Sequence, residues 1–297
     1  MRRFFSAVLW PGLMGICITL NAMAMQSARP MLHFNMIYFG LAATLLLLER
    51  FMPFERNWHA SDSQVGPDLA HTILNKGLIQ IAVATITAMG IAQSVDAAPS
   101  LFWPETWPMA AQVVLGLVIA EIGLYAAHRL AHEWRRLWRF HAVHHSVTKL
   151  WIVNTGRFHF VDTMVSVALS QPLLYFAGAP KVIFLWVAAI TAFIGILTHC
   201  NVDMRSGFLS QIFNTPELHR WHHSRNPAEG NANYGENLML FDHLLGTFLF
   251  PARRPPVDIG ISEPMPASFL AQLRNPFGAA GLPPLAAETA EDAGQEI

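Results

Sequence analysis

Charged residues are scarce in this sequence, and their scarcity argues against an ordinary soluble protein. Asp, Glu, Lys and Arg make up 13% of the 297 residues, whereas 53% are hydrophobic. A soluble domain carries about 25% charged residues. We therefore expect much of the surface to face lipid rather than water. The formal net charge of −1 provides no basic surface, so no nucleic-acid partner is expected.

Several chemical motifs are also missing. The two cysteines, Cys17 and Cys200, both lie in apolar runs, which excludes a scaffold of disulfides. The sequence contains neither a G-x-G-x-x-G motif nor a Walker-type loop, so these phosphate-binding motifs give no support for nucleotide chemistry. It also contains no haem or flavin motif. What it contains instead is long apolar runs and clustered histidines.

The apolar runs have the length of membrane spans, about 17–25 residues. Four of them stand alone, and two more are joined only by the short turn "GAPK", which makes them an antiparallel helical hairpin. We predict an all-α, polytopic membrane bundle of four spans plus this hairpin, with a cytoplasmic, histidine-rich helical cap. The four spans are expected at 4–25, 31–48, 72–92 and 107–127, and the arms of the hairpin at 161–179 and 181–200.

The composition changes along the chain divide it into three parts. Residues 1–105 are expected to form N-terminal spans, and residues 106–255 the catalytic part. Residues 256–297 are rich in Pro and Ala, end in an acidic stretch and are expected to be a disordered tail. Within this tail, "ASFLAQLRNPF" could form a short amphipathic helix. The basic start, apolar core and A-x-A ending of residues 1–24 leave open a cleaved signal peptide.

Lys and Arg are distributed unevenly between the two ends of these segments. With Arg2 and Arg3 in the cytoplasm, only Arg29 and Lys181 fall outside, as the positive-inside rule requires. We therefore expect an integral multi-pass protein, in the inner membrane if bacterial, with both termini and all histidine clusters cytoplasmic. The basic residues expected inside are Arg50, Arg56, Lys76, Arg129, Arg135, Arg136, Arg139, Lys149, Arg157, Arg205, Arg220 and Arg225.

Three histidine clusters follow the apolar runs. His128 and His132 are four residues apart at the end of the fourth span, so they share one helix face if that helix continues. Two further clusters repeat the spacing i, i+3, i+4, which again places three rings on one face. Imidazole is the commonest nitrogen ligand of first-row metals, and eight imidazoles suffice for two ions. The repeated clusters are His141, His144 and His145, and His219, His222 and His223.

Other metal proteins fit this pattern less well. The H-E-x-x-H motif of zinc proteases is absent, as is the E-x-x-H motif of soluble di-iron proteins. A membrane metal transporter would need ligands along its spans near the midplane. A dimetal lipid hydrolase normally has bridging carboxylates, and none falls within the clusters. Both remain alternatives. The isolated His33, His59, His71 and His243 are expected to be bystanders.

The motifs "HRLAHEWRRLWRFHAVHHS", "RFHFVD", "THCN", "ELHRWHHS" and "NYGENLMLFDHLLGTF" together resemble the fatty acid hydroxylase / sterol desaturase superfamily. All eight positions of its boxes H-x-x-x-H, H-x-x-H-H and H-x-x-H-H are matched in order, within about residues 110 to 255. The resemblance also implies two further ligands at the feet of the hairpin, His159 in "RFHFVD" and His199 in "THCN".

Four other residues are candidates for supporting roles. Glu121 lies within the fourth span, two turns before His128, and could line a substrate tunnel, bond to a ligand imidazole or pair with another span. Asn233, Tyr234 and Asp242 match positions of the resembled family that could buttress the last box. We expect Asp242 to be a hydrogen-bond anchor rather than a catalytic acid.

The resemblance implies an integral membrane oxygenase with two iron ions as cofactor and O2 as co-substrate. It would hydroxylate or desaturate an unactivated C–H bond of a lipid, such as a fatty acyl chain or a sterol. Electrons must come from outside, from a ferredoxin or a cytochrome with its NAD(P)H-linked reductase. The sequence leaves the oligomeric state open.

A reporter fused after Ile297 tests the expected orientation. The uneven distribution of Lys and Arg predicts that the fusion is active only on the cytoplasmic side. An engineered cysteine in residues 135–140 should likewise be shielded from a membrane-impermeant label in intact cells. Labelling of that cysteine from outside would contradict the predicted topology.

Overall fold

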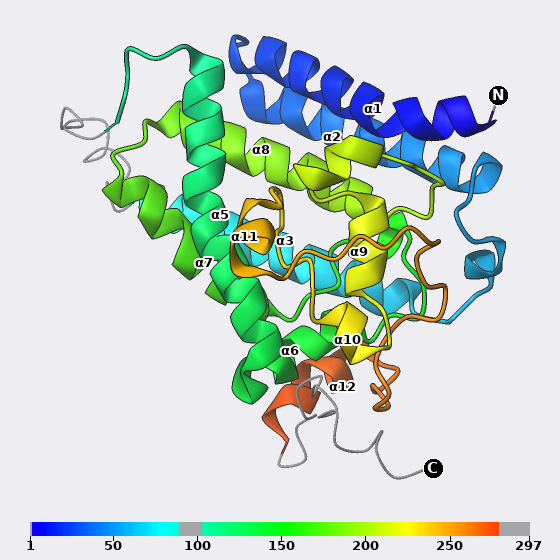
Figure 1. The fold of residues 1–297 in the computed structure, drawn as a ribbon. Coiled ribbons are helices and arrows are strands. Elements are labelled where there is room, and N and C mark those ends of the chain that lie inside the picture. Colours follow the sequence, from blue (N-terminus) through cyan, green and yellow to red (C-terminus); the bar gives the residue numbers. More distant parts are fainter. Residues whose placement is uncertain (1, 89–102, 279–297) are drawn as a thin grey trace, which may run out of the picture.

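The computed structural model describes residues 2–88 and 103–278, and within these ranges every named element is a helix (Figure 1). Four described helices are long and apolar enough to cross a membrane. The prediction of an all-helical, polytopic bundle is therefore confirmed. The four helices are α1 (Arg2–Met25), α2 (Pro30–Phe51), α5 (Met109–Glu133) and α8 (Lys181–Thr198).

Two predicted membrane segments differ in the structure. Helix α7 (Phe160–Phe176) has 17 residues, and at 1.5 Å per residue it is only about 25 Å long. Helices α7 and α8 each pack against α5 and make little contact with each other, so the expected hairpin is splayed around α5. Helix α3 (Val65–Ala88) begins earlier than residue 72, and the end of the predicted 72–92 segment lies outside the described residues.

Polar contacts explain why α3 starts early. Its first turns bury Asp68, His71 and Asn75 instead of exposing them to lipid. Asn75 donates from Nδ2 to the carbonyl oxygen of Phe158 at 2.7 Å, and His71 Nδ1 lies 3.0 Å from the same oxygen. These bonds tie the beginning of α3 to the polar cap, so the helix extends beyond its apolar part.

One hydrophobic core joins four helices of the membrane bundle. Trp10 of α1, Leu45 of α2, Leu117 of α5 and Phe193 of α8 are all buried in it. In Figure 1, α1 and α2 lie side by side along one edge, and α8 lies between them and the rest of the molecule. Helix α5 crosses the bundle and continues toward α6 in the cap.

The polar ends of several helices meet on the same side as the cap. Arg2 Nη2 donates to the carbonyl oxygen of Pro53 at 2.9 Å, which brings together the start of α1 and the end of α2. The backbone N–H of Asp203, beyond the end of α8, donates to the carbonyl oxygen of Met52 at 2.8 Å. The N-terminus and the histidine clusters therefore lie on one side of the bundle.

Short helices form the cap, which contains no strand among the described residues, only isolated β-bridges. Residues 256–278 belong to it, contrary to the expected disordered tail: Ile259 is buried, and α12 (Phe269–Arg274) packs against α3. The acidic residues 279–297 lie outside the described ranges. The other cap helices are η1 (Arg56–His59), α6 (Arg135–His145), η2 (Ile152–Asn154), η3 (Gly207–Gln211), α9 (Pro216–His222), α10 (Pro227–Gly230), α11 (Leu240–Leu245) and η4 (Asn275–Phe277).

The crossing of α5 and α7 depends on a glycine. A Cβ atom on Gly123 would lie 2.2 Å from the carbonyl oxygen of Leu169 and 2.5 Å from the Cα of Ser170. Small residues allow membrane helices to approach each other this closely. Because the obstacle is backbone, a side chain at residue 123 would separate the two helices.

Gly123→Ala should therefore destabilise the protein by about 1–3 kcal/mol, the usual cost of overpacking. Gly195→Ala is the matched control, because a Cβ there meets nothing within 4 Å. The midpoint of thermal unfolding in detergent, measured for both variants, checks the prediction. Equal midpoints for the two variants would show that the α5–α7 crossing tolerates a methyl group.

Candidate metal centre

Nine of the ten histidines predicted as ligands lie in two buried groups. In each group the potential ligand atoms all lie within 4.8 Å of one another. The first group contains five rings and the second contains four. The first is His128, His132, His141, His145 and His222; the second is His144, His199, His219 and His223.

Helical geometry divides each H-x-x-H-H box between the two groups. In α6, His141 and His145 are one turn apart and join the first group, whereas His144 joins the second. The third box is divided in the opposite sense, because His222 joins the first group and its two box partners the second. The two boxes therefore face each other as a pair, and each contributes to both groups. Helix α5 adds two rings to the first group, and the residue after α8 adds one to the second.

Six of the nine rings are oriented through Nδ1. Carbonyl and carboxylate oxygens can only accept hydrogen bonds, so in these rings Nδ1 carries the proton and Nε2 keeps its lone pair. This is the tautomer that metal-bound histidines usually adopt. The pairs are His128 with Tyr234 O (2.7 Å), His222 with Ala232 O (2.8 Å), His144 with Arg157 O (3.2 Å), His141 with Asp162 Oδ2 (2.9 Å), His132 with Asn231 Oδ1 (3.1 Å) and His199 with Asn154 Oδ1 (3.2 Å).

The Nε2 atoms converge within each group. His145 Nε2 lies 3.1 Å from the Nε2 atoms of both His132 and His222. His223 Nε2 lies 3.1 Å from the Nε2 atoms of both His144 and His219. A ring nitrogen has either one proton or one lone pair, so it can form one good hydrogen bond. The two Nε2 contacts around His145 therefore cannot both be hydrogen bonds, and the same holds for the two around His223.

Three further Nε2 atoms, those of His128, His141 and His199, are buried and have no hydrogen-bond partner among the described residues. Buried polar atoms are rarely left unsatisfied unless something binds them. A cation in each group would accept the converging lone pairs and remove their mutual repulsion. The residues present therefore fit a metal ion in each group.

The environment keeps five of the histidines in the cap neutral. Burial lowers the pKa of His145 and His222 well below its ordinary value, and the neighbouring imidazoles lower it further. The same causes, in the same order, lower the pKa values of His144, His219 and His223. Only a neutral imidazole can donate a lone pair to a metal, so the protein prepares these rings for coordination.

The donor set indicates which kind of metal fits. Both groups consist of imidazoles alone, and no carboxylate of the described residues belongs to either. Mg²⁺ and Ca²⁺ prefer oxygen ligands, whereas imidazole suits iron, copper, nickel and zinc. The structure therefore contains two groups suited to first-row transition metals.

Two buried carboxylates hold the segment that follows the third box. Glu121 accepts hydrogen bonds from the backbone N–H groups of Glu236 (2.6 Å) and Asn237 (3.1 and 3.2 Å), and so bonds neither to an imidazole nor to another span. Asp242 accepts from the N–H groups of Tyr234 and Gly235, each at 2.8 Å. Because the carbonyl oxygen of Tyr234 bonds to His128, both carboxylates act on the first histidine group through backbone.

Asn233 supports the same segment from inside the cap. It has a positive φ of 57°, a left-handed conformation that Asn tolerates better than most residues. Its side-chain oxygen accepts from the N–H of Leu249 at 2.8 Å, and its Nδ2 donates to the carbonyl oxygen of the same residue at 2.8 Å. The end of the segment from His223 to Tyr234 is thus held by Leu249 through Asn233 and by Asp242 through Tyr234.

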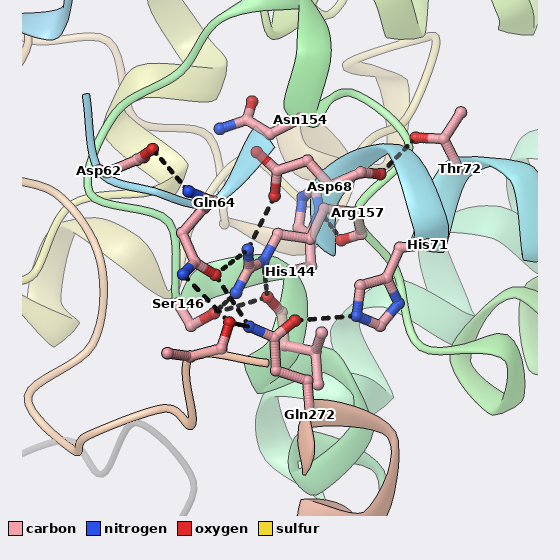
Figure 2. A network of polar contacts seen from close by, with 12 residues as sticks. Asp62, Gln64, Asp68, His71, Thr72, His144, Ser146, Asn154, Arg157 and Gln272 are labelled. Carbon is pink, nitrogen blue, oxygen red and sulfur yellow. Dashed lines mark hydrogen bonds and ion pairs between the residues drawn. The ribbon is translucent and has the colours of Figure 1, made fainter. Parts of the chain in front are cut away.

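A buried arginine supports the second box (Figure 2). Arg157 donates to Asp68 Oδ1 (2.7 Å), Gln64 Oε1 (3.0 Å) and Ser146 Oγ (3.1 Å). It also donates to the carbonyl oxygen of Val143, while its own carbonyl oxygen bonds to the Nδ1 of His144. This network connects the beginning of α3 to the end of α6.

Sequence reasoning missed these supporting residues. Arg157 and Asp162 flank His159 in the quoted motif "RFHFVD", but only the histidine was singled out there. An acid in the first turn of an apolar helix is the signal that would have identified Asp162. Asn154 and Asn231 lie in polar connections, where an isolated Asn carries no comparable signal.

His159 is the one predicted ligand that joins neither group. Its Nδ1 accepts a hydrogen bond from the N–H of Val161 (3.2 Å) and thereby caps α7, and its Nε2 lies 3.2 Å from the carbonyl oxygen of Leu273. Its ring packs against Phe140 and Phe277. Both nitrogens are therefore engaged, Nδ1 in capping α7 and Nε2 in the contact with α12, and His159 lies outside both groups.

The histidines expected to be bystanders also lie outside both groups. His33 bonds to Ser27 at the start of α2, and His243 to the carbonyl oxygen of Gln211. His71 is buried between Phe158 and Gln272, where it contributes to the contact between α3 and α12. His59 is exposed at the end of η1.

Comparison with known proteins places this geometry in a family. The profile of the fatty acid hydroxylase family matches residues 113–247, which contain all nine grouped histidines and therefore both H-x-x-H-H boxes. Over 281 residues the chain is 54% identical to the ornithine lipid hydroxylase OlsE of Rhizobium tropici, covering 93% of this chain and 85% of that protein. The chain belongs to the fatty acid hydroxylase family.

More distant relatives share only part of the chain. Human alkylglycerol monooxygenase is 30% identical over 162 residues, which are 54% of this chain and 34% of that enzyme. A Delta(7)-sterol 5(6)-desaturase of Gibberella zeae is 28% identical over 148 residues, 48% of this chain and 43% of that one. No solved structure matches the chain. As a member of the fatty acid hydroxylase family, the protein is a membrane lipid oxygenase.

Asp162 offers a test of the candidate centre that does not depend on activity. Its carboxylate orients His141, and loss of such an outer partner typically weakens metal binding about 10- to 100-fold. Asp162→Ala should therefore lose metal to a chelator at correspondingly lower concentration, measured as metal content per chain. Asp258→Ala, which removes an exposed carboxylate paired with Arg225, should behave like the wild type.

Proposed function

We propose that the protein binds two iron ions, one in each histidine group, and hydroxylates an ornithine-containing membrane lipid with O2. The observation that carries the proposal is the pair of buried, all-imidazole groups with converging Nε2 atoms. The substrate is suggested by the name of the relative with 54% identity, which is an ornithine lipid hydroxylase. The same similarity favours hydroxylation over desaturation.

The proposed ligands are the nine grouped histidines, in the catalytic part defined as residues 106–255. When bound, iron would supply the reduction of O2 and the cleavage of an unactivated C–H bond. The protein holds the nitrogens in place, because side-chain and backbone acceptors fix six rings through Nδ1. It also keeps water away, since all nine rings are buried. The proposed ligands are His128, His132, His141, His145 and His222 for one ion, and His144, His199, His219 and His223 for the other.

The position of the groups suits a lipid substrate. His128 and His132 lie on the last turns of α5, where this helix leaves the apolar layer and meets the cap. A hydrocarbon chain in the bilayer can approach this level without leaving the membrane. Transport is less compatible with this arrangement, because the ligands gather at helix ends and in the cap instead of along the spans. Hydrolysis is less compatible because the nearest supporting carboxylate, Asp162, bonds to the outer nitrogen of His141.

The proposal also includes the source of electrons and the side of the membrane on which the metal centre lies. The sequence has no haem or flavin motif, so a ferredoxin or a cytochrome with its reductase would deliver electrons from outside. We propose that both termini and the metal centre are cytoplasmic, because the positive-inside rule favours that side for the arginine-rich ends. A soluble donor could then reach the cap directly.

Histidine variants separate ligands from bystanders. His132→Ala, His145→Ala and His222→Ala should each abolish oxygen insertion into ornithine lipid and reduce bound metal below the about two ions expected for the wild type. His33→Ala and His59→Ala should leave both unchanged, because neither ring belongs to a group. Mass spectrometry of lipid extracts and metal analysis of purified protein provide the two measurements.

Membrane insertion of every variant must be shown by its amount in the membrane fraction. Normal turnover in a properly inserted ligand variant would contradict the metal assignment. A wild type with full activity and a single metal ion would contradict the dimetal assignment. Lipid analysis of a strain lacking the protein, compared with its parent, tests the substrate separately. If the purified wild type holds two metal ions but the two strains have the same ornithine lipids, the proposed substrate alone is refuted.

A further inference from the structure

A cavity of about 960 Å³ lies between the start of α1 and α9. Its wall is formed by the first residues of α1, the segment after α8, part of α9 and residues 250–255. Six arginines line it, against two carboxylates. The arginines are Arg2, Arg3, Arg205, Arg220, Arg253 and Arg254, and the carboxylates are Asp203 and Glu217.

We call this hollow the arginine cavity. Its two carboxylates do not neutralise its six arginines, so its wall keeps a net positive charge. Asp203 is shared between Arg2 (3.3 Å) and Arg205 (3.4 Å). Glu217 accepts a hydrogen bond from the N–H of Ser206, and burial raises its pKa, which weakens it as a counter-charge. Arg3 has no ion-pair partner among the described residues.

Two arginines of the cavity use carboxylates outside its wall. Arg254 pairs with Glu55 at 3.2 Å, and Arg253 pairs with Glu229. The side chains of Arg253 and Arg254 are 58% and 57% exposed, whereas those of Glu229 and Glu55 are only 16% and 15% exposed, so each pair is half-buried. Because both arginine side chains are more than half exposed, a ligand that enters the cavity can reach them while these pairs persist.

Arg220 is the most unusual member of the wall. It is fully buried, and its Nη2 donates to the carbonyl oxygens of Cys200 and Val202, both at 2.9 Å. Its Nε and Nη1 have no hydrogen-bond partner within the described ranges, and its guanidinium lies 4.0 Å from the ring of Phe54. A buried cation with two unsatisfied donors is costly unless an anion offsets it.

The cavity lies at the level of the membrane surface. It opens at the first turn of α1, a candidate span of 24 residues whose positive dipole end faces it. Arginines at this position attract anionic lipid headgroups. A guanidinium also matches phosphate geometrically, because it can donate two parallel hydrogen bonds.

We propose that the arginine cavity binds a phosphate group, supplied by the headgroup of an anionic phospholipid. Inorganic phosphate has the same chemistry and is the alternative source. An acidic partner protein fits less well, because Arg220 lies in the wall of a hollow that a convex protein surface does not fill. The proposal is independent of iron and of the lipid that is oxidised.

Phosphate bound here would also reinforce the second histidine group. Arg220 lies between His219 and His222 in the third box, and the carbonyl groups that it holds directly follow His199. Fixing its guanidinium from the cavity side would restrain this part of the cap. The expected effect is on stability and on the retention of His199 in its group, and not on the chemistry itself.

The test compares two double variants of the full-length protein purified in detergent. Arg3→Gln/Arg205→Gln removes two charges from the cavity wall, and Arg135→Gln/Arg136→Gln removes two exposed charges at the start of α6, away from the cavity. Binding to vesicles of phosphatidylglycerol and phosphatidylcholine is measured against vesicles of phosphatidylcholine alone. The thermal unfolding midpoint is measured with phosphatidylglycerol or inorganic phosphate added to the detergent.

The wild type and the Arg135→Gln/Arg136→Gln variant should prefer phosphatidylglycerol and be stabilised by it, whereas the cavity variant should bind about tenfold more weakly. Stabilisation by inorganic phosphate at low concentration, with no added benefit from the lipid, would identify the free ion as the source. Equal binding by both double variants would overturn the proposal, because it would reflect general surface charge. So would absence of stabilisation by either phosphate source combined with capture of an acidic ferredoxin.

Discussion

The convergence of nine buried imidazoles is the constraint on which the rest of the structure depends. Lone pairs that face one another without a proton repel, and buried polar atoms without partners are costly. A cation in each group would resolve this conflict. The rings must also be held in place from behind, and acceptors on Nδ1 do so for six of the nine. The sequence around the boxes is accordingly rich in groups that accept hydrogen bonds.

Three buried ionisable side chains outside the histidine groups help to hold the rings in place. Glu121 seems out of place in an apolar helix when the sequence alone is read, yet two backbone N–H groups satisfy it and its position fixes the segment that reaches His128. Asp242 holds the same segment from the other side. Arg157 does the equivalent for His144 through its carbonyl oxygen, while its guanidinium is held by Asp68. Each charge acts on a ring through the backbone, where a flexible side-chain contact would position it less well.

Spacing along a helix was enough to predict that the boxes lie on α5, α6 and α9, because i, i+3 and i+4 share a face in any helix. Spacing could not predict which ring joins which group, since that depends on how α6 and α9 face each other. It also could not separate His199 from His159: both lie at the foot of an apolar helix, but only one ring turns inward. Composition suggested a short helix within residues 267–277, where α12 lies, but the Pro- and Ala-rich sequence does not reveal the contacts that attach it, such as Gln272 with His71.

Helix α9 shows how closely the separate requirements are joined. Within "HRWHH" the histidines face the two groups, Arg220 faces the arginine cavity, and Trp221 is fully buried beneath the guanidinium of Arg253, 4.2 Å away. Seven residues thus present metal ligands on one side and a cationic wall on the other. Such a helix is too short to be stable alone, so its position must come from the contacts on both sides. Arg220 therefore connects the wall of the cavity to the backbone beside His199, through its bonds to the carbonyl oxygens of Cys200 and Val202.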